Sequence, residues 1–303
     1  MQTAIKNQAA VKGRKKTKDV LTPYIFILPV FIFITIFILV PFGTAIIKSF
    51  YRYDAAAINE FVGFKNYVRL FTQDKKFIIS FGNLLYMGVG LVICFASAVM
   101  GAKMVFSLPN QRFQLLFRNL FTVPIVVPGT VIILMWKFLY YPNIGVFARV
   151  LAAFGQTAPN FLGSEQWVKP SIILIGFPWI SGLNFLVSYA ALQGIDSSVL
   201  EAACIDGASG WKRFMTVELP AIMPQLKSLF VLAIIGLVRD YERYLLLTAG
   251  GPNNASLVPG LHMYQMAFGL GENMYGYACA ISVVLFLMTF IIAFLMLRRR
   301  RED

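Results

Sequence analysis

The run Pro23–Ile47 extends over 25 residues without a single charged side chain. A helix needs about 20 mostly apolar residues to cross a membrane, whereas the apolar part of a cleaved signal peptide needs only about 7–15. The run offers no convincing small-residue cleavage site, so we expect an uncleaved membrane anchor. Composition agrees, because 58% of the chain is apolar and only 14% is charged, against about 45–50% and 25% in soluble domains.

Apolar runs of spanning length recur along the chain. The clear further ones are Phe77–Gly101, Leu120–Tyr141, Pro170–Ile195 and Tyr275–Leu297. A sixth candidate, Ser228–Leu247, contains charged residues near its end. The pattern predicts an all-α integral membrane protein with six transmembrane helices.

Basic residues predict the orientation of these spans. Six Lys and Arg side chains precede the first run, and four arginines follow the last. Since basic flanks mark cytoplasmic ends, both termini should be cytoplasmic and the number of spans even. We expect a basic tail at residues 1–22, a six-span domain at 23–297 with a cytoplasmic loop at about 196–227, and a second tail at 298–303. This placement argues against nucleic-acid binding.

The charged cluster in the sixth candidate allows two interpretations. On a continuous helix, Arg239 could pair with Glu242, and Asp240 with Arg243, at a spacing of three residues. The charges could lie near the outer interface and neutralise one another. Alternatively, they could face a water-filled pathway, where intramembrane ionisable groups are usually found.

The cytoplasmic loop contains a pattern typical of a capped helix. Ser198 and Glu201 have the spacing of a capping box, which predicts a helix beginning at Ser198. Gly207 predicts the end of that helix, because glycine readily adopts positive φ.

Two further features of this loop suggest a docking element. Ala202 and Ala203 are small enough to let another surface approach closely. A second helical segment is expected at Trp211–Val217, ending before Pro220. The loop is therefore predicted to be a helix–glycine–helix projection.

The residues of this loop resemble a known motif. Glu201-Ala202-Ala203, Asp206-Gly207-Ala208 and Leu219-Pro220 are similar to the EAA motif of ABC-importer permeases. Three other segments, Phe61–Tyr67, Trp136–Leu139 and Leu247–Pro252, resemble the carbohydrate-uptake branch, in particular its MalF-like permeases. The resemblance extends over about residues 24–297.

This resemblance implies a transport subunit rather than an enzyme. The docking residues for an ATPase would be Glu201, Ala202, Ala203, Asp206, Gly207, Ala208, Leu219 and Pro220. The implied partners are a second permease subunit, two ATPase subunits and an extracytoplasmic solute-binding protein, in the cell membrane of a bacterium or archaeon. The chain has no phosphate-binding Gly-x-x-x-x-Gly-Lys-Ser/Thr motif, so we expect the ATPase subunits to bind ATP and Mg²⁺.

The family resemblance also implies residues that line the solute pathway. Two of them, Ile125 and Gly129, would form a helical pair between prolines where the third span bends. The complete set is Ile125, Gly129, Trp179, Ile180, Leu183, Asn184, Ala233, Leu237, Asp240 and Glu242. Asn184 and Asp240 are the sharpest candidates, because an unpaired polar group facing lipid is costly.

No catalytic or metal-binding constellation can be assembled from the sequence. The single histidine, His262, has no nucleophile at a recognisable spacing, so a structural role is expected. The three cysteines, Cys94, Cys204 and Cys279, lie far apart and are interpreted as small apolar residues.

The favoured hypothesis is an ATP-driven importer of a sugar or oligosaccharide. A polyol or a glycerophosphodiester as solute would use the same architecture. A less favoured alternative is an ion-coupled secondary carrier that uses the charges at 239–243 as a relay and needs no ATPase.

Overall fold

The computed structural model describes residues 17–54, 58–175, 182–269 and 274–298, and nearly all regular elements within them are helices. The first half contains α1 (Thr17–Ile34), a π-helical turn (Thr35–Leu39), α2 (Val40–Lys48), β1 (Tyr51–Tyr53), β2 (Asn59–Phe61), α3 (Lys65–Thr72), α4 (Lys75–Phe106), α5 (Gln111–Thr122), a 3₁₀ turn (Val123–Ile125) and α6 (Gly129–Leu139). The second half contains α7 (Val146–Ala153), α8 (Glu165–Leu174), α9 (Gly182–Gln193), α10 (Ser197–Ile205), α11 (Gly210–Arg213), a π-helical turn (Phe214–Glu218), α12 (Leu219–Arg239), α13 (Glu242–Thr248), α14 (Pro259–Phe268) and α15 (Tyr275–Arg298).

Four helical stretches in the described residues are long and apolar enough to cross a membrane. They are Pro23–Lys48, Lys75–Phe106, Gly210–Arg239 and Tyr275–Met296. A fifth crossing results if the bent pair α5 and α6 is counted as one span. The remaining predicted span, Pro170–Ile195, includes residues 176–181, which lie outside the described residues.

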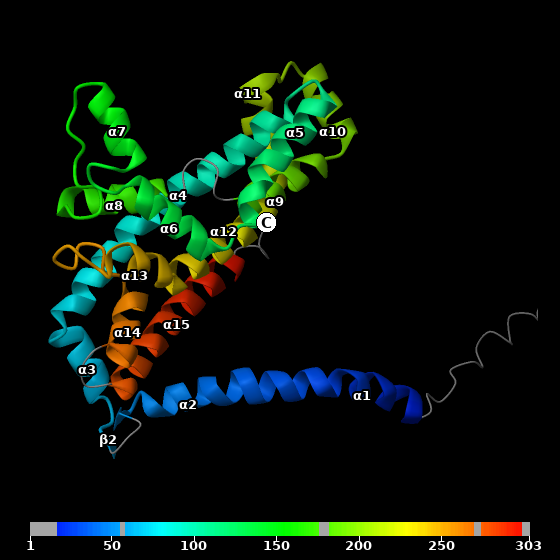
Figure 1. Ribbon diagram of the computed structural model, residues 1–303. Helices are drawn as coiled ribbons and strands as arrows, with labels where there is room; N and C mark the ends of the chain where they lie inside the picture. Colours follow the sequence, from blue (N-terminus) through cyan, green and yellow to red (C-terminus); the bar gives the residue numbers. More distant parts are fainter. Residues whose placement is uncertain (1–16, 55–57, 176–181, 270–273, 299–303) are drawn as a thin grey trace, which may run out of the picture.

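The first spanning helix projects away from the other helices (Figure 1). None of its most apolar part is buried inside the chain. It meets the rest of the molecule through α2, where the rings of Phe42 and Phe286 lie 4.8 Å apart at a steep angle. This helix therefore has lipid or another chain, rather than its own protein, as its main surroundings.

Polar contacts define the relative directions of three spanning helices. Asp74 precedes α4 and accepts a hydrogen bond of 2.7 Å from Tyr277, which lies in the first turn of α15. At the opposite end of α4, Lys103 contacts Glu218, which immediately precedes α12. Helices α4 and α15 therefore run in the same direction and α12 runs against them, as Figure 1 shows.

The predicted bend of the third span is confirmed as a sharp break. Helices α5 and α6 are inclined at 93° across residues 126–128. Pro124 and Pro128 flank the break. Proline removes a backbone donor and disfavours helical geometry in the residue before it, so two prolines four residues apart end the helix.

The sixth candidate run, Ser228–Leu247, was predicted to be the fifth span in chain order. The prediction of one continuous helix there is wrong. The spanning helix begins earlier and ends at Arg239, because Asp240 has an extended backbone with ψ 97°. The Asp240 carboxylate accepts a hydrogen bond from the backbone N–H of Arg243 and forms an ion pair of 3.1 Å with its side chain. Asp240 thus lies just before a new helix, α13, whose N-cap is Tyr241, and the helical spacing expected for Arg239 and Glu242 is lost.

A short antiparallel hairpin, β1–β2, was not predicted from the sequence. Tyr51 pairs with Phe61 and Tyr53 with Asn59. Each strand has only three residues, which is too short for an alternating pattern to stand out in the sequence. The hairpin follows the first spanning helix directly and leads into α3. It lies at the end of the molecule where α4 and α15 begin (Figure 1).

Gly90 provides a test of the packing between α4 and α8. A Cβ atom at Gly90 would lie 2.5 Å from the Ile173 side chain, whereas one at Gly88 would meet nothing within 4 Å. We expect Gly90→Ala to destabilise the protein by about 1–3 kcal/mol, as overpacking does. Gly88→Ala on the same helix should be neutral or slightly stabilising. Thermal unfolding in detergent measures both, and equal melting temperatures would contradict the packing.

Candidate functional site

Residues 196–218 form a compact projection beside α5, which we call the knob (Figure 1). Its first helix, α10, begins at Ser197, and the Asp196 side chain accepts a hydrogen bond from the N–H of Ser198 at 3.3 Å. The predicted start at Ser198 with a Glu201 capping box is therefore wrong. A carboxylate caps the helix and also complements the positive end of its dipole, so Asp196 takes this role in place of the Ser198 hydroxyl.

Gly207 ends α10 as predicted. Its φ is +76°, in the left-handed region. The Gly207 N–H donates to the carbonyl of Cys204, and the Ala208 N–H donates to the carbonyl of Ala203. These two bonds are those of a Schellman motif, which reverses the chain after a helix. The reversal carries the chain into α11.

The sequence predicted that the second helix of the knob ends before Pro220, and this prediction is wrong. A π-helical turn, Phe214–Glu218, joins α11 directly to α12, so a helical stretch continues from Gly210 to Arg239. Leu219 donates to the carbonyl of Phe214 across this wide turn. Pro220 directly follows this wide turn inside the continuous stretch and does not end it.

The knob has one face toward the protein and one toward its surroundings. Ala203 is only 6% exposed and Ala208 is also buried, so neither is free to contact another chain. Ile205, by contrast, is 86% exposed at the tip, and Trp211 is also exposed. Among the predicted docking residues, the exposed ones are Glu201, Ala202, Asp206, Gly207 and Pro220, whereas Leu219 is half-buried.

Sequence reasoning missed Ile205 and Trp211 as members of this surface. Exposed apolar side chains are candidates for contact with a partner when several share one surface, and Ile205 and Trp211 are both exposed on the knob. The available signal was their position on either side of the Gly207 reversal. On sequence alone, their apolar character suggested burial within the helices.

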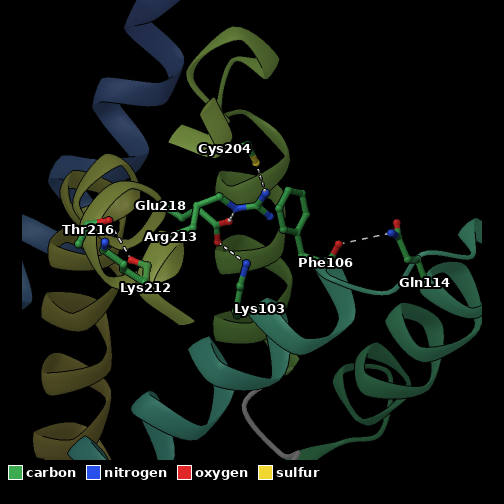
Figure 2. Close-up of polar contacts among 8 residues, drawn as sticks. All are labelled: Lys103, Phe106, Gln114, Cys204, Lys212, Arg213, Thr216 and Glu218. Atoms are coloured by element: carbon green, nitrogen blue, oxygen red, sulfur yellow. Dashed lines mark hydrogen bonds and ion pairs between the residues drawn. The ribbon is translucent and has the colours of Figure 1, made fainter. Parts of the chain in front are cut away.

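A buried ion network anchors the knob to the membrane helices (Figure 2). Glu218 has no exposed surface, and its two carboxylate oxygens contact Lys103 at 2.5 Å and Arg213 at 2.8 Å. Arg213 also donates to the sulfur of Cys204 at 3.3 Å. The predicted role of Cys204 as an apolar side chain is therefore wrong, because Cys204 is exposed and contacts a guanidinium group.

The first pair of predicted pathway residues lies on two different elements. Ile125 belongs to the 3₁₀ turn, and Gly129 begins α6 after the break. The predicted helical pairing of the two is therefore wrong. A Cβ atom on Gly182 would lie 2.7 Å from the Ile125 side chain, so the turn packs closely against the beginning of α9.

The next four candidates are only partly within the described residues. Trp179 and Ile180 lie outside them. Leu183 is exposed in the first turn of α9, and Asn184 beside it is half-buried and engaged in an interaction. The structure therefore brings Leu183 and Asn184 close to the broken third span but leaves the face shared with Ile180 untested.

The last four candidates lie around the end of α12. Ala233 is half-buried on α12, and Leu237 packs against two apolar clusters that include Tyr244 and Val238. Asp240 follows the helix end and pairs with Arg243, so it does not continue the face of Ala233 and Leu237. Glu242 is exposed at the beginning of α13.

His262 is buried at the end of the molecule where α4 and α15 begin. Its Nε2 atom lies 2.7 Å from the carboxylate of Asp74, which also accepts the bond from Tyr277. Burial raises the pKa of Asp74, but hydrogen bonds from Tyr277, His262 and the Phe77 N–H outweigh burial and leave that pKa below its ordinary value. The cluster joins α4, α14 and α15, which is a structural role for His262.

Apolar helices of spanning length make this chain a multi-pass membrane protein. The profile of the family described as "Binding-protein-dependent transport system inner membrane component" matches residues 93–302, and the chain belongs to this family. It is thus a permease component of an ABC transporter, a transport subunit rather than a catalytic one. Family membership favours this class over the ion-coupled secondary carrier.

Three similar proteins extend over most of the chain. The diacetylchitobiose uptake system permease protein NgcF of Streptomyces coelicolor is 28% identical and aligns with 93% of this chain and 83% of its own. The sn-glycerol-3-phosphate transport system permease protein UgpA of Yersinia pestis is 31% identical over 81% of this chain and 83% of its own. A bacterial alginate ABC transporter, solved in complex with an alginate pentasaccharide-bound periplasmic protein, contains a chain of the same fold. That chain has a TM-score of 0.81, is 22% identical, and aligns over 93% of this chain and 96% of its own.

Proposed function

We propose that this permease imports a sugar or oligosaccharide and that the knob transmits the ATPase cycle to its membrane helices. The exposed tip around Ile205, held in shape by the left-handed Gly207, is the observation that carries the proposal. Required partners are two ATPase subunits, which bind ATP and Mg²⁺, a second permease subunit and an extracytoplasmic binding protein. The periplasmic protein in the alginate transporter complex supports the last of these.

The proposed topology has six crossings and both termini in the cytoplasm. The parallel α4 and α15, with the antiparallel α12, support it, because the beginning of α12 and the C-terminal end of α15 then lie on one side. The broken pair α5–α6 and the expected span Pro170–Ile195, of which only the parts outside residues 176–181 are described, would be the third and fourth crossings. The arginines after α15 assign that side to the cytoplasm by the positive-inside rule, and the knob lies there.

The proposed solute pathway lies between the broken third span, the beginning of α9 and the end of α12. Breaks in spanning helices expose backbone groups that must line a cavity or be buried in protein, which supports a pathway at this depth. Of the ten predicted residues, Ile125, Leu183, Asn184 and Asp240 remain the best-supported candidates. Asp240 and Arg243 would offer paired charges to a polar solute.

The solute class rests on the relatives. NgcF is named for a disaccharide derivative and the structural neighbour transports alginate, which supports a carbohydrate. UgpA is named for sn-glycerol-3-phosphate, so a phosphorylated polyol is the second candidate.

Reconstitution of the complete transporter tests the proposal. The permease is co-expressed with its partner permease, ATPase and binding protein, purified by a tag on the permease, and placed in proteoliposomes. We expect the ATPase to co-purify, and ATP-dependent uptake of diacetylchitobiose or another oligosaccharide in preference to sn-glycerol-3-phosphate. Failure of the ATPase to co-purify would overturn the docking role, and preferential uptake of glycerol phosphate would overturn the solute class.

A further inference from the structure

Glu218 is the only acidic side chain in a buried cluster that joins three helices of the described chain. One carboxylate oxygen contacts Lys103 in the last turn of α4, and the other contacts Arg213 at the end of α11. Figure 2 shows the two cations approaching the carboxylate from different elements. Both oxygens are therefore engaged, and each belongs to a different connection.

The π-helical turn makes this arrangement possible. Arg213 and Glu218 are five residues apart, and in an ordinary α-helix residues at this spacing face different directions. A π-helical turn closes its hydrogen bonds over five residues, so it brings the two side chains into line. The turn lies between the knob and α12. The local backbone irregularity thus serves to aim Arg213 at the buried carboxylate.

The surroundings of the cluster are apolar. The Nζ atom of Lys103 lies 5.7 Å from the centre of the Phe106 ring and 5.6 Å from that of Phe214. Phe214 itself is buried in a cluster with residues of α4, α9 and α12. Burying charges is costly, and replacing a buried ion pair by apolar residues is often neutral or stabilising. Stability alone is therefore a weak reason for this network.

The network lies between the knob and the membrane helices α4 and α12. The knob is covalently continuous with the rest of the chain only before Asp196 and after Glu218. Lys103 adds a connection to α4, and the Arg213 bond to Cys204 adds one back to α10. A displacement of α10 would therefore reach α4 and α12 through the same carboxylate.

We propose that Glu218 is a positioning residue that makes the knob, α4 and α12 move together when a bound ATPase changes conformation. This inference rests on the proposed docking of an ATPase at the knob. Glu218 is fully buried, so this role needs no contact with the solute or ATP. It determines how far a movement at the knob travels along the membrane helices.

Hydrogen–deuterium exchange on the reconstituted complex, with and without MgATP and vanadate, tests the inference. In the wild-type complex, exchange should change in the knob and in the distant halves of α4 and α12, residues 75–90 and 229–239. Glu218→Gln should keep the change in the knob but reduce the distant change about five- to tenfold, the low end of typical coupling between sites. Thr216→Val is the matched control, because Thr216 is exposed in the same π-helical turn and donates only to the carbonyl of Lys212.

A second variant separates positioning from stability. Lys103→Met/Glu218→Leu removes the buried pair and leaves Arg213, which is partly exposed, free to reach solvent. We expect this double variant to yield as much complex as the wild type and still to lose the distant change. If hydrogen exchange in the distant halves of α4 and α12 changes as much in Glu218→Gln or in the double variant as in the wild type, the inference is wrong. The proposed docking would be unaffected by that result. If the ATPase does not co-purify with the wild-type permease, the proposed docking is wrong, and the inference that rests on it is wrong as well.

Discussion

Gly207→Val will abolish solute uptake while the permease still inserts into the membrane. The φ of +76° at Gly207 lies in the left-handed region, which costs an L-residue roughly 1–2 kcal/mol and a β-branched residue more. No atom lies within 4 Å of the position that a Cβ would occupy. The strain is therefore in the backbone, and the chain would relieve it by abandoning the reversal that presents the knob.

Asparagine at the same position provides the control. Asn tolerates the left-handed conformation, so Gly207→Asn should retain most of the uptake. Uptake is measured in cells lacking the native permease, and insertion is checked by the amount of permease in isolated membranes. Equal transport by the valine and asparagine variants would show that the left-handed turn is dispensable for transport.

Ile205→Asp will detach the ATPase without unfolding the knob. Its side chain is 86% exposed, so an aspartate there is hydrated in the free permease and becomes buried and unpaired only when a partner docks. Truncating a hot-spot residue near the centre of an interface typically costs about 2 kcal/mol or more, equivalent to a roughly thirtyfold weaker Kd, and we expect Ile205 to be such a residue. Co-purification of the ATPase with tagged permease at several salt concentrations measures the loss.

Two comparison variants make this result specific. Ile205→Leu keeps an apolar surface and should retain the ATPase. Ala203→Asp places a charge inside the knob, where only 6% of the residue is exposed, and should lower the amount of folded permease as well as docking. If Ile205→Asp binds the ATPase as tightly as the wild type, the tip of the knob is not the contact surface.

Features governed by local chemistry could be predicted from the sequence. Long apolar runs predict spanning helices wherever they are uninterrupted, as in α4 and α15. Gly207 was predicted because a helix end followed by a left-handed residue is determined by a few adjacent backbone bonds. The break between Pro124 and Pro128 was predicted for the same reason.

Features that depend on competition or distance could not be predicted in this way. The chain turns at Asp240, whose carboxylate accepts a hydrogen bond from the Arg243 N–H, and the apolar residues on both sides give no sign of this turn. Asp196 and Ser198 compete for one cap, and the sequence alone does not rank them. Lys103 and Glu218 are 115 positions apart, so no spacing rule connects them. Trp179 and Ile180 lie outside the described residues.

The isolation of the first spanning helix has a consequence for biosynthesis. Because none of its most apolar part is buried against the rest of the chain, its entry into the bilayer depends on lipid alone and not on later segments. It can partition from the translocon as soon as it is synthesised, and in the proposed topology the basic residues before it would stay in the cytoplasm. The end of α12, where Asp240 follows Arg239, emerges much later and finds its neighbours already in place. The first helix would therefore set the orientation of the chain before the charges at the end of α12 reach the membrane.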